Sequence, residues 1–172
     1  MKIAYTIAAC PLGRLLVAAT ERGVCFAGLG DADADLEAAL ASDFPGADIR
    51  RDDAELRDWA SAVLRYFDDP PASPDVPLDI AGTQFQRRVW DALRAIPYGS
   101  TRSYGQLARG LGEPGTARAV GRACATNPVS LVIPCHRAVG EHGKLTGYRW
   151  GLERKRALLI REEALPQLSL GL

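Results

Sequence analysis

The sequence predicts an α+β protein in two parts: a small antiparallel sheet with helices, then a mostly helical part that contains a helix-turn-helix (winged-helix-like) and a short active-site strand. Three observations support this fold class. The first 30 residues hold three strand-like runs separated by turn signals. Four prolines follow between residues 70 and 77. Beyond them, apolar residues recur at helical spacing, and residues suited to helix capping precede them.

The N-terminal part is predicted to be a meander covered by two helices. Residues 2–8, 14–20 and 24–29 are rich in β-forming residues, and the turn signals Pro-Leu-Gly and Glu-Arg-Gly join them. Aspartates within 31–35 offer N-caps for one helix, and a second helix over about 53–68 carries an apolar stripe. No group of side chains suited to chemistry gathers in this part.

The four prolines predict a stiff linker and a domain boundary. We expect an N-terminal α/β domain over residues 1–77 and a C-terminal domain over residues 78–172. The zero net charge hides an asymmetry. Residues 1–80 carry 7 Lys and Arg against 15 Asp and Glu, a balance of −8, and residues 81–172 carry 14 against 6, a balance of +8. This asymmetry suggests a nucleic-acid partner for the basic half, although attraction between the two halves explains it equally well.

The C-terminal part contains the pattern of a helix-turn-helix. Thr83, Ser103 and Thr116 are placed to cap helices over about 84–96, 104–111 and 117–126. Small residues recur along the last of these helices, from Ala117 to Ala125. A helix with small side chains can enter a nucleic-acid groove with Arg118 and Arg122 projecting, or it can simply pack closely against another helix.

The final helix, about 152–164, places two ionisable residues on its apolar side. At about 100° per residue, Lys155 and Glu162 fall within the apolar stripe that Leu152, Leu158 and Leu159 define. Burying such groups is costly unless they are paired. They are therefore predicted to form an ion pair or to belong to a site.

The candidate nucleophile is Cys135. An apolar run at 131–133 predicts a strand that ends at Pro134, and a thiol and an imidazole follow as Cys135 and His136. A cysteine attacks as its thiolate, which a neighbouring base makes available. Adjacent side chains of an extended chain point in opposite directions, so the two groups can cooperate directly only if the chain turns there.

Neither a metal nor another cofactor is expected. The four cysteines lack the paired spacing of a zinc site, and the two histidines both lie late in the chain. The cysteine pattern does not resemble a disulfide framework, so we expect a reducing, cytoplasmic location. No stretch is long and apolar enough to span a membrane.

Several motifs together resemble one family. The sequence Pro-Cys-His-Arg at 134–137 is preceded by Asn127-Pro128 and Ser103-Tyr104, and Thr-Gly-Tyr-Arg-Trp-Gly follows at 146–151. In this arrangement the chain is similar to the O6-alkylguanine-DNA alkyltransferases, also called methylated-DNA-protein-cysteine methyltransferases. The resemblance covers about residues 82–163, and it is weaker over the first 80 residues.

The resemblance implies a direct reversal of DNA damage. Cys135 would take the alkyl group from O6-alkylguanine in duplex DNA, and O4-methylthymine is left open as a second substrate. The thioether product resists hydrolysis, so each protein molecule would act once. The reaction would require rotation of the target base out of the duplex.

The family's catalytic residues correspond to six positions of this chain. His136 is implied to activate Cys135 through a water molecule, and Glu162 to orient His136. Asn127 would be a hinge, and Tyr104 would donate a hydrogen bond or a proton to the guanine. Lys155 matches a lysine near the site.

The resemblance also implies a DNA-binding face and an alkyl pocket. In the family the helix-turn-helix enters the minor groove, where Arg118 would fill the gap left by the flipped nucleotide. The expected DNA-binding residues are Ser103, Tyr104, Thr116, Ala117, Arg118 and Arg122. Tyr148, Arg149 and Trp150 would form the alkyl pocket. Trp150 stands where some relatives carry glycine. This difference predicts a narrow pocket that favours methyl over benzyl groups.

Two other functions compete with alkyl transfer. A non-transferring damage sensor or DNA-binding regulator would use the helix-turn-helix alone, but relatives of that kind lack the cysteine. A cysteine hydrolase would leave the basic half unexplained. We expect a monomer in solution that binds double-stranded DNA and no membrane, with cooperative assembly on DNA left open.

Overall fold

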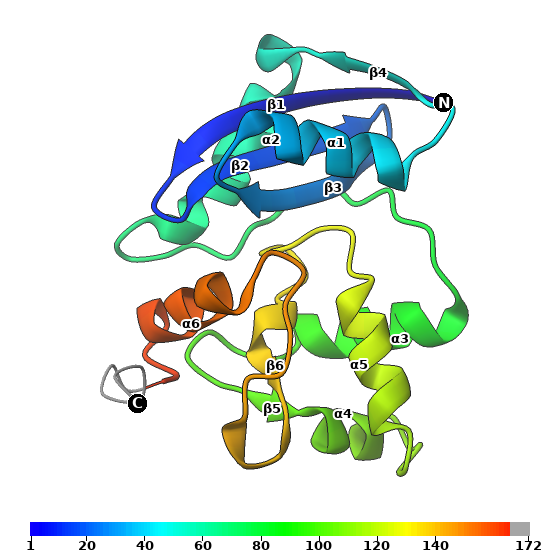
Figure 1. Ribbon diagram of the computed structural model, residues 1–172, viewed down its shortest axis with the longest axis vertical. Helices are drawn as coiled ribbons and strands as arrows, with labels where there is room; N and C mark the ends of the chain where they lie inside the picture. The colour runs from blue at the N-terminus through cyan, green and yellow to red at the C-terminus, as the bar shows by residue number, and fades with distance from the viewer. Residues whose placement is uncertain (166–172) are drawn as a thin grey trace. The chain divides into compact units, whose positions relative to one another are not determined.

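The computed structural model describes residues 1–165, which form two compact units (Figure 1). Unit 1 consists of Met1–Ala81 together with Pro128–Val132. Unit 2 consists of Gly82–Asn127 and of the described chain from Ile133 onward. The chain therefore leaves unit 2 after Asn127, adds a short segment to unit 1, and returns to unit 2 just before Cys135.

Unit 1 is built on a four-stranded sheet. Its strands are β1 (Lys2–Cys10), β2 (Gly13–Thr20), β3 (Gly23–Gly30) and β4 (Asp48–Arg51), in the order β3-β2-β1-β4. The first three pair antiparallel, which confirms the predicted meander, and β4 is parallel to β1. The sequence of β4, Asp-Ile-Arg-Arg, has a single apolar residue on a mostly exposed edge. Periodicity therefore gave no signal for this strand.

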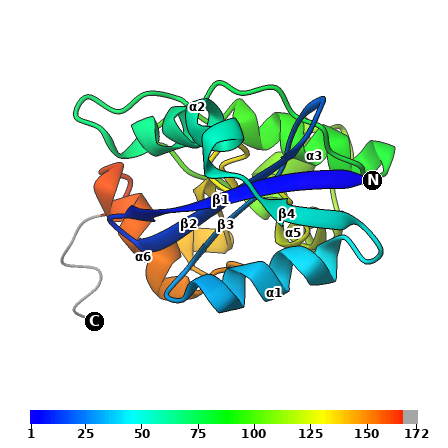
Figure 2. The ribbon, with the colours of Figure 1, turned by 90° about the horizontal axis from the view of Figure 1, so that it is seen from above.

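Two helices cover opposite faces of the sheet (Figure 2). They are α1 (Asp33–Asp43) and α2 (Asp53–Leu64), and a 3-10 turn, η1 (Arg65–Phe67), continues α2. Neighbouring side chains of β1 show the two faces: the Tyr5 hydroxyl donates to Glu37 of α1, and Thr6 Oγ1 donates to Asp53 of α2 at 2.8 Å. Because both faces are covered, β1 to β3 are buried along most of their lengths.

The start of α1 corrects one expectation. Its N-cap is Ala32, and no side chain caps the helix, so the aspartates at 31–35 do not act as expected. Asp33 instead lies in the first turn, where its charge suits the helix dipole, and it pairs with Arg14 at 2.7 Å.

The edge of β3 receives two other segments of unit 1. Val24 N donates to Pro77 O at 2.8 Å, and Asp79 N donates to Val24 O at 2.9 Å. Further along, Ala27 N donates to Pro128 O at 3.0 Å and Ser130 N to Ala27 O at 3.1 Å. The first of these contacts requires Gly23, since a Cβ there would lie 2.7 Å from Pro77 O. This pairing ties the chain to unit 1 beyond the proline-rich linker, as far as Ala81.

Unit 2 contains the helix-turn-helix. Helix α3 (Gln84–Arg94) and helix α4 (Tyr104–Gly110) begin at the N-caps expected at Thr83 and Ser103, and in both helices the N-cap is part of a capping box. Helix α5 (Ala117–Ala125) follows the turn after α4 and packs against both helices, with Trp90 Nε1 donating to Ala123 O at 2.9 Å. Thr116 is the N-cap of α5, but its hydroxyl donates to Glu113 O at 2.6 Å instead of capping the helix.

The strand predicted before Cys135 does not form. Residues 131–133 contain a turn in which Leu131 has φ +72°, and only isolated bridges flank it. Their apolar character reflects burial and not a regular ladder. Cys135–Arg137 then forms a 3-10 turn, η2, and the short strand β6 (Ala138–Val139) pairs in parallel with β5 (Arg102–Ser103) after the cysteine.

The rest of unit 2 brings the chain back to this turn. A 3-10 turn, η3 (Glu141–Gly143), follows β6, and α6 (Leu152–Arg161) ends at the C-cap Glu162. Lys155, Leu158, Leu159 and Glu162 are all buried, which confirms this part of the stripe predicted from the helical period, whereas Leu152 at the start of the helix is half-buried. Among the described residues, no helix is long and apolar enough to cross a membrane.

Candidate active site

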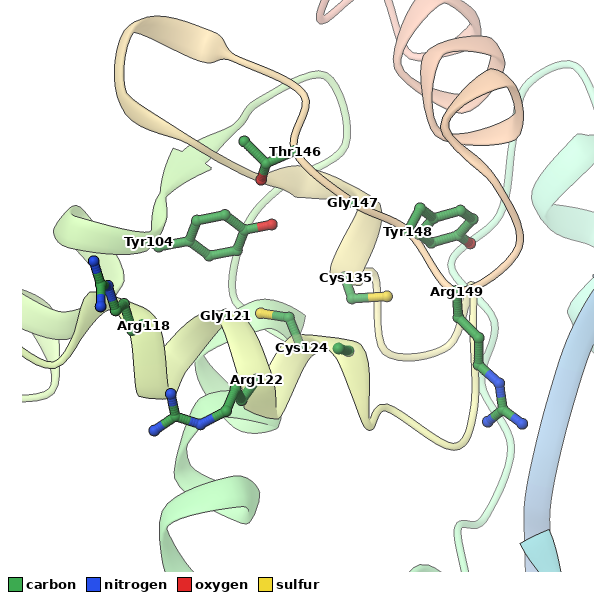
Figure 3. Close-up of a pocket in the computed structure, with 11 residues that line it drawn as sticks. Tyr104, Arg118, Gly121, Arg122, Cys124, Cys135, Thr146, Gly147, Tyr148 and Arg149 are labelled. Carbon is green, nitrogen blue, oxygen red and sulfur yellow. The ribbon is translucent and has the colours of Figure 1, made fainter. Parts of the chain in front are cut away.

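A cavity of about 580 Å³ in unit 2 contains the thiol of Cys135 (Figure 3). Its walls come from the start of α4, one face of α5, the η2 turn and the segment 146–149. Arg118 and Arg122 stand on one side and Arg149 on the other, as Figure 3 shows. The lining residues are Tyr104, Arg118, Gly121, Arg122, Cys124, Ala125, Cys135, Thr146, Gly147, Tyr148 and Arg149.

The η2 turn resolves the geometric difficulty of an adjacent thiol and imidazole. With three residues per turn, successive side chains diverge by about 120° instead of alternating across a strand. Cys135 lines the cavity, whereas His136 is directed to the C-terminal end of α6, where it meets Glu162. Both are buried, with 6% and 0% of their surfaces exposed.

Glu162 is the centre of a buried network. Its Oε2 lies 2.6 Å from His136 Nε2 and accepts from Arg137 Nη2 at 3.1 Å, and its Oε1 accepts from Arg137 Nε at 2.8 Å. Gly99 N donates to the same Oε1 at 3.3 Å. Gly99 has φ +88°, a conformation that favours glycine, and a Cβ there would lie 3.1 Å from Glu162 O. The carboxylate thus connects α6, the η2 turn and the loop after α3.

The inward-facing charges of α6 have separate partners. Glu162 pairs with Arg137 and His136, while Lys155 Nζ donates to Gly147 O at 3.0 Å. Arg137 is the residue that the sequence reasoning missed as a member of the site. The position of Glu162 on the apolar stripe indicated that its buried carboxylate needs a cation or hydrogen-bond donors, but it did not indicate which residue supplies them.

The environment of Cys135 contains opposing influences. Burial raises the pKa of the thiol, whereas a hydrogen bond from the Asn127 side chain and the positive charge of Lys155 lower it. Asn127 Nδ2 also donates to Ile133 O at 2.7 Å. Asn127 therefore connects the end of α5 to the residues just before the thiol.

His136 is set up as a neutral base. Burial lowers its pKa from an ordinary value of about 6.5, and the hydrogen bond and charge of Glu162 oppose this shift. Arg137 and Lys155 also act to lower the pKa. A neutral imidazole can accept a proton, which a permanently charged one cannot.

Tyr104 and Lys155 lie near the same thiol. Tyr104 forms a hydrogen bond with Thr146, and burial raises its pKa, so that its phenol stays protonated (Figure 3). Lys155 Nζ is 5.9 Å from the centre of the Tyr104 ring. Burial lowers the pKa of Lys155, and the two nearby cysteines, when ionised, raise it.

The predicted DNA-binding residues divide into two groups. Tyr104, Arg118 and Arg122 line the cavity, and both arginines are exposed. Ser103, Thr116 and Ala117 do not line it and mark the beginnings of α4 and α5.

The predicted alkyl pocket requires a correction at one position. Tyr148 and Arg149 line the cavity, but Trp150 does not. The Arg149 guanidinium lies 4.6 Å from the centre of the Trp150 ring. Trp150 therefore meets the cavity through Arg149, whose guanidinium lies over its ring.

Comparison with known families supports one assignment over nearly the whole chain. The family described as "6-O-methylguanine DNA methyltransferase, DNA binding domain" matches residues 84–164, and its "ribonuclease-like domain" matches residues 3–80. A methylated-DNA–protein-cysteine methyltransferase of Mycolicibacterium paratuberculosis is 53% identical over 119 residues, which cover 67% of this chain and 72% of that protein. The chain belongs to the methylated-DNA–protein-cysteine methyltransferase family.

Other members of the family extend the comparison. The bifunctional transcriptional activator/DNA repair enzyme Ada of Escherichia coli is 47% identical over 162 residues, which span 94% of this chain but only 46% of Ada. Mycobacterium tuberculosis OGT in complex with DNA has a TM-score of 0.72 and 35% identity, with 95% of this chain and 94% of that one covered.

The stack on Trp150 leads to a first testable prediction for this family member. Arg149 lines the cavity, so we expect a bulky alkyl group to displace it from Trp150, and leaving an exposed cation–π contact costs about 0.5–1 kcal/mol. We expect Trp150→Gly to accelerate transfer from O6-benzylguanine by roughly two- to fivefold, the factor that this energy corresponds to. Trp150→Phe, which retains a ring for Arg149, is the matched control. Equal benzyl-transfer rates in wild type and Trp150→Gly would count against this role.

Proposed function

We propose that the protein repairs DNA by transferring the alkyl group of O6-alkylguanine to its own Cys135, irreversibly and once per molecule. One observation carries the proposal. Cys135 lies in a cavity lined by the helix-turn-helix, and the buried, neutral His136 that follows it contacts the buried Glu162 through Nε2. This arrangement is that of a base-activated nucleophile.

The proton path follows from which histidine nitrogen is engaged. Nε2 of His136 faces Glu162, so Nδ1 is the atom that receives the proton of Cys135, through a bridging water molecule. Glu162 then stabilises the imidazolium that forms, as a triad carboxylate does. Asn127 and Lys155 favour the thiolate, since both act to lower the pKa of Cys135.

The transfer is an in-line displacement at the alkyl carbon. A bond forms between Cys135 Sγ and this carbon while its bond to guanine O6 breaks, and the electron pair of that bond passes to the guanine. Tyr104, whose raised pKa keeps its phenol protonated, donates a hydrogen bond or a proton to the ring as the charge develops. The base recovers its ring proton and the thiol loses one, so the products are guanine and a thioether.

DNA binding is assigned to the helix-turn-helix. The short side chains of α5 allow its close approach to a minor groove, with contacts to the backbone from Ser103, Thr116, Ala117 and Arg122. Phosphate contacts position the protein without reading the sequence, and salt weakens them. Arg118 occupies the space that the flipped nucleotide leaves.

This role of Arg118 predicts a selective loss. Filling the gap offsets part of the few kcal/mol that unstacking costs. We expect Arg118→Ala to slow transfer from duplex DNA by about tenfold or more, a change of about 1.4 kcal/mol. Transfer from free O6-methylguanine base should be unchanged. Arg156→Ala, which removes an exposed arginine of α6, controls for net charge. Equal losses on duplex and free base would contradict the assignment.

The proposed reaction takes place in the C-terminal part of the protein. All proposed catalytic groups belong to unit 2, within the C-terminal DNA-binding alkyltransferase domain proposed for residues 78–172. The N-terminal α/β domain contributes no reacting group. Because Cys135 must remain a free thiol, the activity requires a reducing compartment, for which we propose the cytoplasm. We propose a monomer as the acting species.

A titration of damage against protein tests the proposal. Duplex containing O6-methylguanine is supplied in several-fold excess, and restored guanine is counted at completion. One guanine restored per protein molecule is the expected result. No restoration despite binding would indicate a damage sensor, and continued turnover would indicate a hydrolytic enzyme.

A further inference from the structure

Arg137 is the cation of the buried network around Glu162. Its Nε and Nη2 both donate to Glu162, at 2.8 and 3.1 Å, and its Nη1 donates to Ile96 O at 2.8 Å. Only 9% of the residue is exposed, and its guanidinium lies 5.6 Å from the centre of the Tyr98 ring. Arg137 therefore connects the Glu162 carboxylate to the loop that follows α3.

This arrangement fixes the direction of the carboxylate. The two parallel donors of a guanidinium match the two oxygens of a carboxylate, a geometry that a lysine ammonium cannot reproduce. Because the fork holds both oxygens, Oε2 stays 2.6 Å from His136 Nε2. Gly99 N also donates to Glu162 Oε1, at 3.3 Å, which is longer than the two hydrogen bonds from Arg137.

The positive charge of Arg137 also affects the protonation of His136. A buried carboxylate in contact with an imidazole favours the protonated ring, and a cation next to the carboxylate weakens that effect. Three charged groups shift the pKa of His136: Lys155 in α6, Glu162 at the C-cap of α6, and Arg137 in the η2 turn. The thiol of Cys135 precedes the ring, and the loop after α3 contributes the Ile96 carbonyl to Arg137. Arg137 is thus the cation in direct contact with Glu162.

We propose that Arg137 is a positioning residue for the transfer reaction: it aims Glu162 at His136 and offsets its charge, so that His136 remains a neutral base at the pH of the reaction. The proposal rests on the function assigned to Cys135. It adds a fourth member to the set of thiol, imidazole and carboxylate.

Titration of His136 tests the charge effect without DNA or transfer. The chain has two histidines, so His142→Gln assigns the imidazole signals in NMR spectra. We expect Arg137→Gln to raise the pKa of His136 by about one unit or more, the usual effect of a neighbouring charge. Arg137→Lys, which keeps the charge, should leave the pKa near that of wild type. The increase should be smaller when Glu162→Gln is also present.

Single-turnover transfer rates against pH test the effect on the reaction. A raised pKa keeps His136 protonated to higher pH, so the acid limb of the profile should move upward in Arg137→Gln. Arg137→Lys should keep the limb in place but transfer at least about fivefold more slowly on the plateau, because the fork is lost. Arg156→Gln, with the same charge change at an exposed site, should resemble wild type in both respects.

Several outcomes would overturn the proposal. If the role of Arg137 is purely structural, its variants should lose transfer activity only in proportion to the unfolded fraction. The pKa of His136 in the folded protein should then be unchanged. If Arg137→Gln does not fold, Arg137→Lys decides: a wild-type plateau rate refutes the positioning role. If no variant or wild-type protein transfers methyl, the titration still stands, and the failure then belongs to the proposed function.

Discussion

Replacing Cys135 with alanine is expected to abolish methyl transfer and to leave duplex binding intact. The thiol is 6% exposed and lines the cavity, while the arginines proposed to contact DNA lie on the exposed face of α5. Removing it deletes the acceptor without altering that face. Transfer of labelled methyl from duplex DNA and binding by gel shift measure the two properties separately.

A second cysteine makes this prediction more demanding. Cys124 lines the same cavity, but burial raises its pKa to about 12, and the residue that follows it is Ala125 and not a histidine. A thiol with such a pKa contains very little thiolate at neutral pH. We therefore expect no transfer to Cys124 in Cys135→Ala. Cys10→Ser, in unit 1, should transfer as wild type does, and methyl uptake by Cys135→Ala would contradict the assignment.

Glu162→Gln is expected to have the second-largest effect. An amide cannot stabilise the imidazolium as a carboxylate does, and it leaves the guanidinium of Arg137 buried without its anion. General base catalysis contributes about 10²–10⁴-fold to such reactions, so the transfer rate should fall by about this factor. Breaking a buried ion pair from one side should also lower the free energy of unfolding by about 3–5 kcal/mol.

The stability of this variant must be measured along with its rate. Urea unfolding gives the first quantity, and single-turnover transfer at a temperature where the variant is folded gives the second. Glu163→Gln alters the next residue, which is exposed, and should change neither. A folded Glu162→Gln protein with the wild-type transfer rate would show that the network is structural only.

The features that could be predicted from the sequence depend on local patterns. Alternation and turn signals identified the meander, and the N-cap residues Thr83 and Ser103 indicated the beginnings of two helices. The helical period placed Lys155 and Glu162 on the buried side of α6 before any partner was known. Each of these inferences needs only residues within a few positions of one another.

The features that could not be predicted depend on contacts between distant residues. Arg137 and Glu162 are 25 positions apart, and nothing local distinguishes Arg137 from Lys155 as the partner of the carboxylate. The apolar run before Cys135 resembled a strand because it is buried, although its backbone turns at Leu131. Trp150 was placed in the pocket by analogy, whereas the ring supports Arg149 at the cavity edge.

The most direct test of the central claim is to locate the transferred group. The protein is incubated with duplex DNA that contains O6-methylguanine, digested, and mapped by peptide mass spectrometry. We predict one added methyl group on the peptide that contains Cys135, in an amount equal to the guanine restored. Repaired DNA with an unmodified Cys135, or methyl on another residue, would contradict the account.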